Sequence, residues 1–95
     1  MMKKDDFISS IGYDGPAAIV DRARKVKNAG KSLTTLLEEG SFRAATALAL
    51  YNDSEEDLQT VADYYNKLAG SSYTATTIAR VFGIAKVDVP KILFL

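Results

Sequence analysis

Five basic residues lie close together in the chain and could bind a phosphate or carboxylate group: Arg22, Arg24, Lys25, Lys27 and Lys31. Arginine and lysine donate strong, charge-assisted hydrogen bonds to such oxyanions. On a helix, however, these side chains spread over the whole solvent-facing arc around the apolar positions Ile19, Ala23 and Val26. We therefore interpret the cluster as a solvated helix face, with a phosphate- or acid-binding patch as the alternative.

A short acidic segment offers carboxylates that could bind a cation: Asp53, Glu55, Glu56 and Asp57. The segment lacks the spaced ligands and the glycine of a calcium loop. It stands at the start of an expected helix, where Ser54 or Asp53 can cap free amides and the helix dipole favours negative charge. We interpret these residues as capping residues and predict neither a metal site nor a cofactor.

Cysteine and histidine are both absent from the sequence. Their absence removes thiolate nucleophiles, imidazole bases and most transition-metal ligands. The glycine-containing segments 12–15 and 30–32 lack the spacing of a dinucleotide-binding or phosphate-binding loop. Because no general base, activated nucleophile or cofactor cradle is present, the sequence predicts a protein that is not an enzyme.

Residues 74–93 carry a pattern of small, apolar and glycine positions. Ala79 is small where two helices could cross, and Gly83 permits a tight turn. The apolar contact between the two expected helices would be formed by Ile78, Phe82, Ile84, Val89 and Ile92. The segment resembles the helix-turn-helix of many bacterial DNA-binding proteins, whose second helix enters the major groove. The resemblance implies that Lys86, Asp88 and Lys91 face DNA and that Arg80 approaches a phosphate. The alternative is a helical corner that packs on the core.

The most hydrophobic run of the sequence is residues 92–95, which carry no polar side chain. Leaving such side chains in water forfeits roughly 1.5–3 kcal/mol each. We expect this run to dock on helices at 42–51 and 74–83, or to be buried across a homodimer. Tyr64, at the edge of an apolar helix face, is a further expected contact. The predicted partner-binding residues are therefore Tyr64, Leu93, Phe94 and Leu95.

The sequence predicts that short helices, separated by capping and turn residues, position these side chains. Helical spacing covers 3–11, 16–28, 33–39, 42–51, 55–69 and 74–83, and residues 88–95 fit either a short helix or an extended segment. Residues 42–51 are apolar almost all round, which predicts a central helix. No segment alternates apolar and polar residues over enough positions to predict a β-strand. The sequence predicts one all-α domain, residues 1–95, with five to six helices and a helix-turn-helix-like corner.

The 95 residues balance 12 basic against 12 acidic side chains, so no overall field attracts nucleic acid or membrane. No apolar run approaches the roughly 18 residues of a membrane span. The charged start of the chain is unlike a secretory signal, and we expect a cytoplasmic protein. The predicted function is a small binding module that holds a protein partner or a second copy through a helical surface. The alternative is a DNA-binding regulator that uses residues 74–93.

Overall fold

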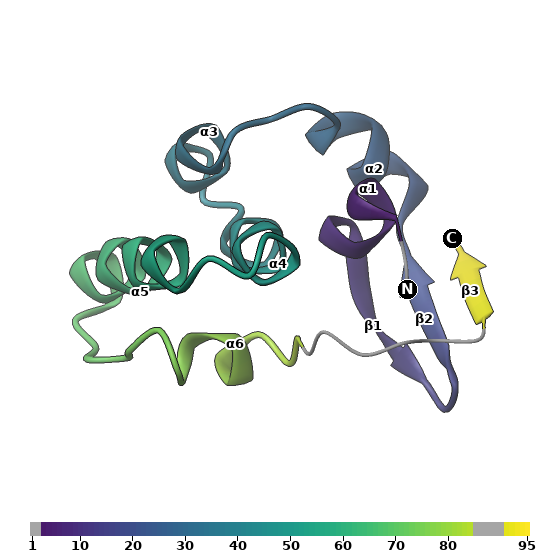
Figure 1. Ribbon diagram of the computed structural model, residues 1–95. Coiled ribbons are helices and arrows are strands. Elements are labelled where there is room, and N and C mark those ends of the chain that lie inside the picture. The colour runs from purple at the N-terminus through teal and green to yellow at the C-terminus, as the bar shows by residue number, and fades with distance from the viewer. Residues whose placement is uncertain (1–2, 85–90) are drawn as a thin grey trace.

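The computed structural model describes residues 3–84 and 91–95, which form six helices and three strands (Figure 1). In chain order these are α1 Lys4–Ile8, β1 Ser10–Asp14, β2 Ala17–Val20, α2 Arg22–Asn28, α3 Leu33–Glu38, α4 Phe42–Tyr51, α5 Glu55–Ala69, α6 Ile78–Val81 and β3 Lys91–Phe94. The prediction of an all-α fold is wrong, because a three-stranded sheet accompanies the helices.

The sheet has the strand order β1-β2-β3. Strands β1 and β2 form an antiparallel hairpin in which Ser10 lies opposite Val20. Gly15 provides the positive φ of the hairpin turn, at 57°. Strand β3 comes from the far end of the described chain and pairs with β2 in parallel, with Phe94 beside Val20. The sheet therefore joins the two ends of the sequence.

The predicted helix over 16–28 is a strand followed by a shorter helix. The chain stays extended through Ala17–Val20, where β-branched Ile19 and Val20 favour a strand. Helix α2 begins only after Asp21, whose carboxylate accepts hydrogen bonds from the backbone N–H groups of Ala23 and Arg24. Asp21 is therefore the N-cap of α2.

The predicted C-terminal corner also differs from the structure. Helix α6 is only four residues long, Ile78–Val81. Residues 91–93, which the resemblance placed in a second helix, lie in strand β3. The expected docking of this segment on the helices is replaced by hydrogen bonding to β2. The β-branched Ile92 and the aromatic Phe94 favour a strand in this segment.

Helices at 42–51 and 55–69 are confirmed with the predicted bounds. In the turn before α4, the N–H of Gly40 donates to Leu37 O and the N–H of Ser41 donates to Leu36 O. These two bonds close a Schellman motif, which requires a left-handed residue at Gly40. Ser54 caps α5 by accepting from the N–H of Asp57, as the acidic start of that helix predicts.

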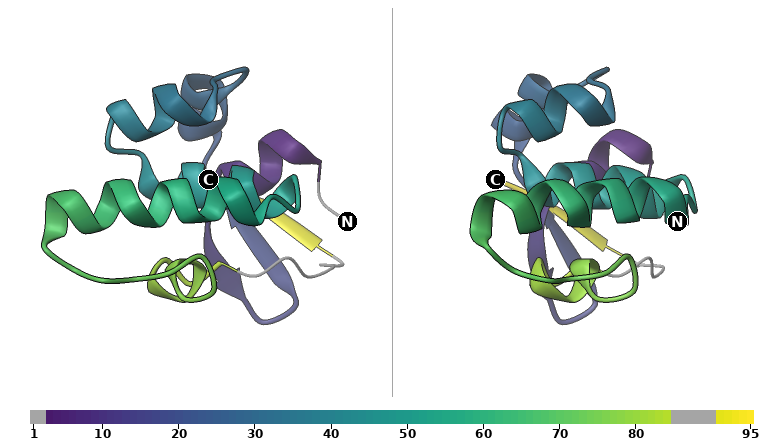
Figure 2. Two further views of the ribbon diagram at one scale, coloured as in Figure 1. Left: turned by 60° about the vertical axis from the view of Figure 1, so that its left-hand side comes forward. Right: turned by 90° about the vertical axis from the view of Figure 1, so that its left-hand side faces the viewer.

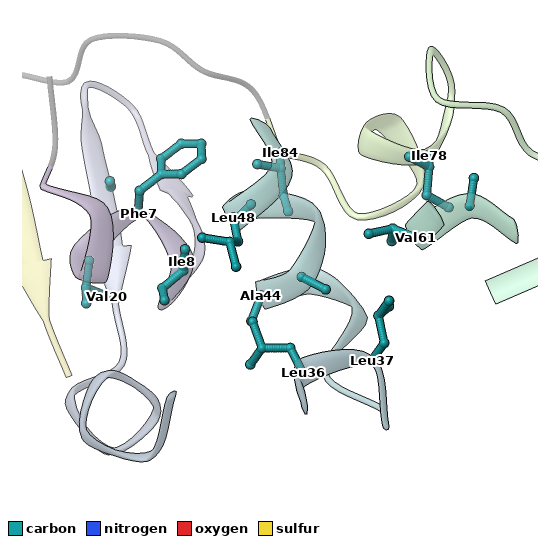
Figure 3. Close-up of a cluster of buried hydrophobic side chains, with 14 residues drawn as sticks. Phe7, Ile8, Val20, Leu36, Leu37, Ala44, Leu48, Val61, Ile78 and Ile84 are labelled. Carbon is teal, nitrogen blue, oxygen red and sulfur yellow. The ribbon is translucent and has the colours of Figure 1, made fainter. Parts of the chain in front are cut away.

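One continuous apolar core has α4 at its centre, as the sequence predicts. Helix α4 packs against α1, α3, α5 and α6. In both views of Figure 2, α3 lies above α5 and α6 lies below it. Figure 3 shows the core running from Phe7 and Val20 at the sheet, past Leu48, to Val61 and Ile78. Within the described residues, no helix is both long and apolar enough to cross a lipid bilayer.

Replacing Gly40 by alanine should lower the free energy of unfolding by about 1–2 kcal/mol. The φ of Gly40 is 75°, and an added Cβ would have no neighbouring atom within 4 Å. The cost therefore comes from the left-handed backbone alone. Urea denaturation followed by circular dichroism measures it. A change below about 0.3 kcal/mol would contradict the turn geometry.

Candidate functional site

Strand β3 presents an open edge on the side away from β2. The backbone N–H of Leu95 donates to Val20 O, and Leu95 O accepts from the N–H of Arg22. In a parallel ladder, alternate residues direct their N–H and C=O groups to opposite sides of the strand. The backbone groups of Ile92 and Phe94 therefore point to the open edge. No described strand lies beyond them.

The predicted contact residues at 93–95 lie along this edge and are exposed. The relative solvent exposures of residues Leu93, Phe94 and Leu95 are 45%, 41% and 69%. Because side chains alternate along a strand, Ile92 and Phe94 lie on one face, where Ile92 packs against the core, and Leu93 and Leu95 lie on the other face. We call Leu93, Phe94 and Leu95 the β3 strip. The β3 strip is apolar, and the adjacent residue Ile92 anchors the strand to the core.

Helix α2 holds one face of the β3 strip. The guanidinium of Arg22 lies 5.4 Å from the centre of the Phe94 ring, and Lys25 Nζ lies 5.5 Å from it. Lys25 also forms an ion pair of 2.7 Å with the buried carboxylate of Asp6. Cation–π contacts of this kind orient an exposed ring without burying it. Phe94 is thus positioned while its ring stays accessible.

Tyr64, the other predicted contact residue, lies apart from the strip. It is 38% exposed on α5 and lines a surface cavity with Lys67 and Leu68. Helix α5 and strand β3 stand at opposite sides of the molecule in Figure 1, with α4 between them. The structure therefore does not bring Tyr64 together with Leu93.

The residues assigned to DNA by resemblance fall in three places. Arg80 is exposed on α6, and Lys91 is exposed as the first residue of β3. Lys86 and Asp88 lie outside the described residues. The DNA contact made by the four residues stays a prediction. Its structural premise, a second helix that reaches residue 93, is replaced by a strand.

A second surface feature is a cavity of about 400 Å³ at the start of α4. Its lining residues are Arg24, Lys27, Asn28, Gly40, Ser41, Phe42, Arg43, Ala44 and Phe82. Two members of the basic cluster thus meet Arg43, which the sequence analysis did not select. A usable signal existed, since Arg43 is the sole charged residue within the apolar stretch 42–51.

Arg43 is held firmly at the wall of this basic cavity. Its Nε donates to Ser10 O at 2.7 Å, and Nη1 donates to Phe82 O. Its remaining nitrogen, Nη2, is buried without a hydrogen-bond partner. Burial lowers the pKa of the Arg43 guanidinium, Tyr13 raises it, and the neighbouring charge of Arg24 lowers it again. The group stays cationic, because arginine titrates far above neutral pH.

Among residues 3–84 and 91–95, no three acidic, cysteine or histidine side chains gather as a metal site would require. Ser54 caps α5, and Glu55, Glu56 and Asp57 lie in its first turn, where the helix dipole favours negative charge. Comparison with protein-family models, with curated proteins and with solved structures finds no match to this chain. The function therefore has to be argued from the β3 strip itself.

Proposed function

We propose that this chain is a protein-binding module that associates with a second copy of itself through the open edge of β3. The observation that carries the proposal is the outward-facing backbone of Ile92 and Phe94, bordered by exposed Leu93 and Leu95. An unpaired strand edge is a ready template for another strand. The predicted helical docking surface is thereby replaced by a strand.

A second copy is the occupant that fits the geometry most simply. Two β3 edges can pair antiparallel about a two-fold axis, so that each strand supplies the same donors and acceptors to the other. The result is a continuous six-stranded sheet, twice the three strands of one copy. The chain carries no net charge, and self-association is not opposed by overall repulsion.

The side chains of the edge also favour association. Proteins that keep a strand edge monomeric protect it with charges, prolines or bulges. Lys91 is the only charged residue of β3, and the β3 strip has none. Each large apolar side chain covered on pairing contributes roughly 1.5–3 kcal/mol. Leu93 and Leu95 occur twice in the dimer, which offsets the entropy lost on association.

The test compares two leucine-to-lysine variants of the full chain. Leu93→Lys places a charge in the β3 strip, whereas Leu68→Lys places the same charge on α5, where Leu68 is 67% exposed. We expect a dimer for the wild type and for Leu68→Lys. For Leu93→Lys we expect a dissociation constant raised about 100-fold or more, because two buried leucines are lost per dimer.

Analytical ultracentrifugation over a wide concentration range measures the dissociation constants, and circular dichroism checks that each variant stays folded. A wild type that remains monomeric at about 1 mM, the weak limit of specific association, would overturn the proposal. Dissociation by Leu68→Lys but not by Leu93→Lys would instead place the interface on the Tyr64 surface of α5. Equal dimerisation of both variants would also contradict a β3 interface.

A further inference from the structure

Strand β3 offers a second copy two residues whose backbone groups face away from its own sheet. The strand is the last in the order β1-β2-β3 and lies at the outer side of the sheet in Figure 1. Leu95 bonds inward, because its N–H and its carbonyl both bond to the chain at 20–22. Alternation along the strand makes Leu93 face inward as well. The open edge therefore consists of the backbone groups of Ile92 and Phe94.

One two-fold register lets both of these residues form complete pairs within the described strand. In an antiparallel ladder, a residue that faces the other strand exchanges two hydrogen bonds with the residue opposite it. Ile92 opposite Phe94 of the second copy forms such a pair, and the two-fold axis repeats it as Phe94 opposite Ile92. The axis then passes between Leu93 and Leu93 of the second copy. Those two leucines are opposed without a hydrogen bond between them.

Neighbouring registers use the edge less completely. If Ile92 lies opposite itself, Phe94 lies opposite position 90, which is a proline without an N–H, so Phe94 O lacks a donor. If Phe94 lies opposite itself, Ile92 has no opposite residue within strand β3. A slip by one residue sets an outward-facing residue opposite an inward-facing one, which a regular ladder does not allow.

The side chains on the core face of the strand favour the same register. Ile92 and Phe94 share this face, since side chains alternate along a strand. Each Ile92 therefore meets Phe94 of the second copy. A β-branched residue opposite an aromatic residue is a favourable cross-strand pair. The cationic groups of Arg22 and Lys25 lie over the Phe94 ring and hold it in place for this contact.

The outer face of the strand matches as well. Within one copy, Leu93 lies beside Ile19 of β2. The two-fold axis adds the second Leu93 on the other side and the second Ile19 beyond it, so one apolar row crosses the joined sheet. Lys91 lies opposite Leu95, and like charges are not opposed anywhere in the pairing.

We infer that the second copy binds in this register, with Leu93 opposite its own counterpart at the two-fold axis and Lys91 opposite Leu95. The inference rests on the proposed self-association and specifies the surface that performs it. The order Ile–Leu–Phe at 92–94 is complementary to its own reverse in both backbone and side chains. A second copy of this chain is therefore the partner that the strand fits.

Single-cysteine variants of the full chain test the register, because the native sequence has no cysteine. Opposed residues without a mutual hydrogen bond have Cα atoms about 4.5 Å apart, which a disulfide can span. In a buffer of oxidised and reduced glutathione, Leu93→Cys should form a covalent dimer at least about tenfold faster than Leu95→Cys. In the inferred register the two copies of residue 95 are offset by four positions, roughly 13 Å along the strand.

Leu68→Cys is the matched control for random collision. Leu68 is 67% exposed on α5, away from the inferred interface. Its covalent dimer should form as slowly as that of Leu95→Cys. Ultracentrifugation before oxidation checks that each strand variant still associates. A rate for Leu93→Cys no higher than for Leu68→Cys, in a variant that does associate, would overturn the inference.

A mixture of two variants identifies the register independently. Lys91→Cys and Leu95→Cys should give a covalent heterodimer when mixed, whereas each variant alone should stay largely monomeric after denaturation. A preferred link between residues 91 and 93 would instead show Ile92 opposite itself. A preferred link between residues 93 and 95 would show Phe94 opposite itself. Either of these two patterns would overturn the inferred register.

The wild-type chain supplies a test that needs no substitution. In a mixture of isotope-labelled and unlabelled chains, isotope-filtered NMR should detect contacts between the Ile92 methyl groups of one copy and the Phe94 ring of the other. A dimer without these contacts, or with cross-links of another register, would overturn this inference and leave the proposed function standing. A wild type that stays monomeric in ultracentrifugation would overturn both.

Discussion

Replacing Leu48 by alanine is expected to lower the free energy of unfolding by about 2–5 kcal/mol. Leu48 is 5% exposed in the middle of α4, where it lies between the Phe7 side and the Val61 side of the core (Figure 3). Truncation removes apolar contacts and leaves a cavity that four surrounding helices cannot readily close. Domains of this size have a free energy of unfolding of only about 5–15 kcal/mol. The substitution therefore removes a large fraction of the total stability.

Leu68→Ala is the matched control for this substitution. Leu68 lies on the neighbouring helix α5 but is 67% exposed, so the same chemical change should cost less than about 0.5 kcal/mol. Urea unfolding, followed by circular dichroism at low protein concentration, gives both values from one protocol. Similar costs for Leu48→Ala and Leu68→Ala would contradict a central position for α4.

The central helices could be predicted from sequence because their signals are local. Residues 42–51 are apolar on every side, and such a segment is stable only inside a bundle. Helix α5 begins with a serine cap and acidic residues and ends at Gly70, which adopts the left-handed conformation. Both patterns depend on neighbours within one or two turns. The tertiary structure did not need to override them.

The sheet could not be predicted because its strands are short and one of its two pairings is non-local. Strands β2 and β3 are four residues each, too short for an alternating pattern to stand out. Ala17 and Ala18 suit a helix as well as a strand, and Pro16 suits the first turn of a helix. Strand β2 is fixed by pairing on both sides, with β1 in the hairpin and with β3, which lies more than 70 residues later in the chain. Single-sequence periodicity carries no information about that partner.

The candidate sites likewise combine features that have a local sequence signal with features that depend on the tertiary structure. The apolar composition of Leu93, Phe94 and Leu95 predicts that they are contact residues, whereas their exposure and their place on a strand edge depend on the sheet. The basic cluster is visible in the sequence, but the predicted helix at 16–28 begins six residues before α2 does. Arg24 and Lys27 meet Arg43 only because α2 begins at Arg22 and packs near the start of α4. Helix boundaries therefore decide which charges converge.

Replacing Phe7 by alanine is expected to lower the free energy of unfolding by about 3–5 kcal/mol. Phe7 lies on the five-residue helix α1, is 1% exposed, and packs its ring 6.0 Å from that of Tyr51. Figure 3 places it between the hairpin and α4. Since α1 packs directly against α4, the loss should destabilise the whole molecule and not only its sheet.

The shape of the unfolding curve decides whether the sheet and the helices form one cooperative unit. The helical circular dichroism signal and the tyrosine fluorescence of Phe7→Ala should fall together in one transition, as two-state unfolding requires. Phe7→Leu keeps most of the apolar volume and should cost less than about 1.5 kcal/mol. If the helical signal of Phe7→Ala survives to the wild-type midpoint while the NMR amide signals of β1 and β2 are lost early, α1 and the sheet unfold on their own. In that case the apolar cluster that runs from Phe7 to Ile78 is not one energetic core.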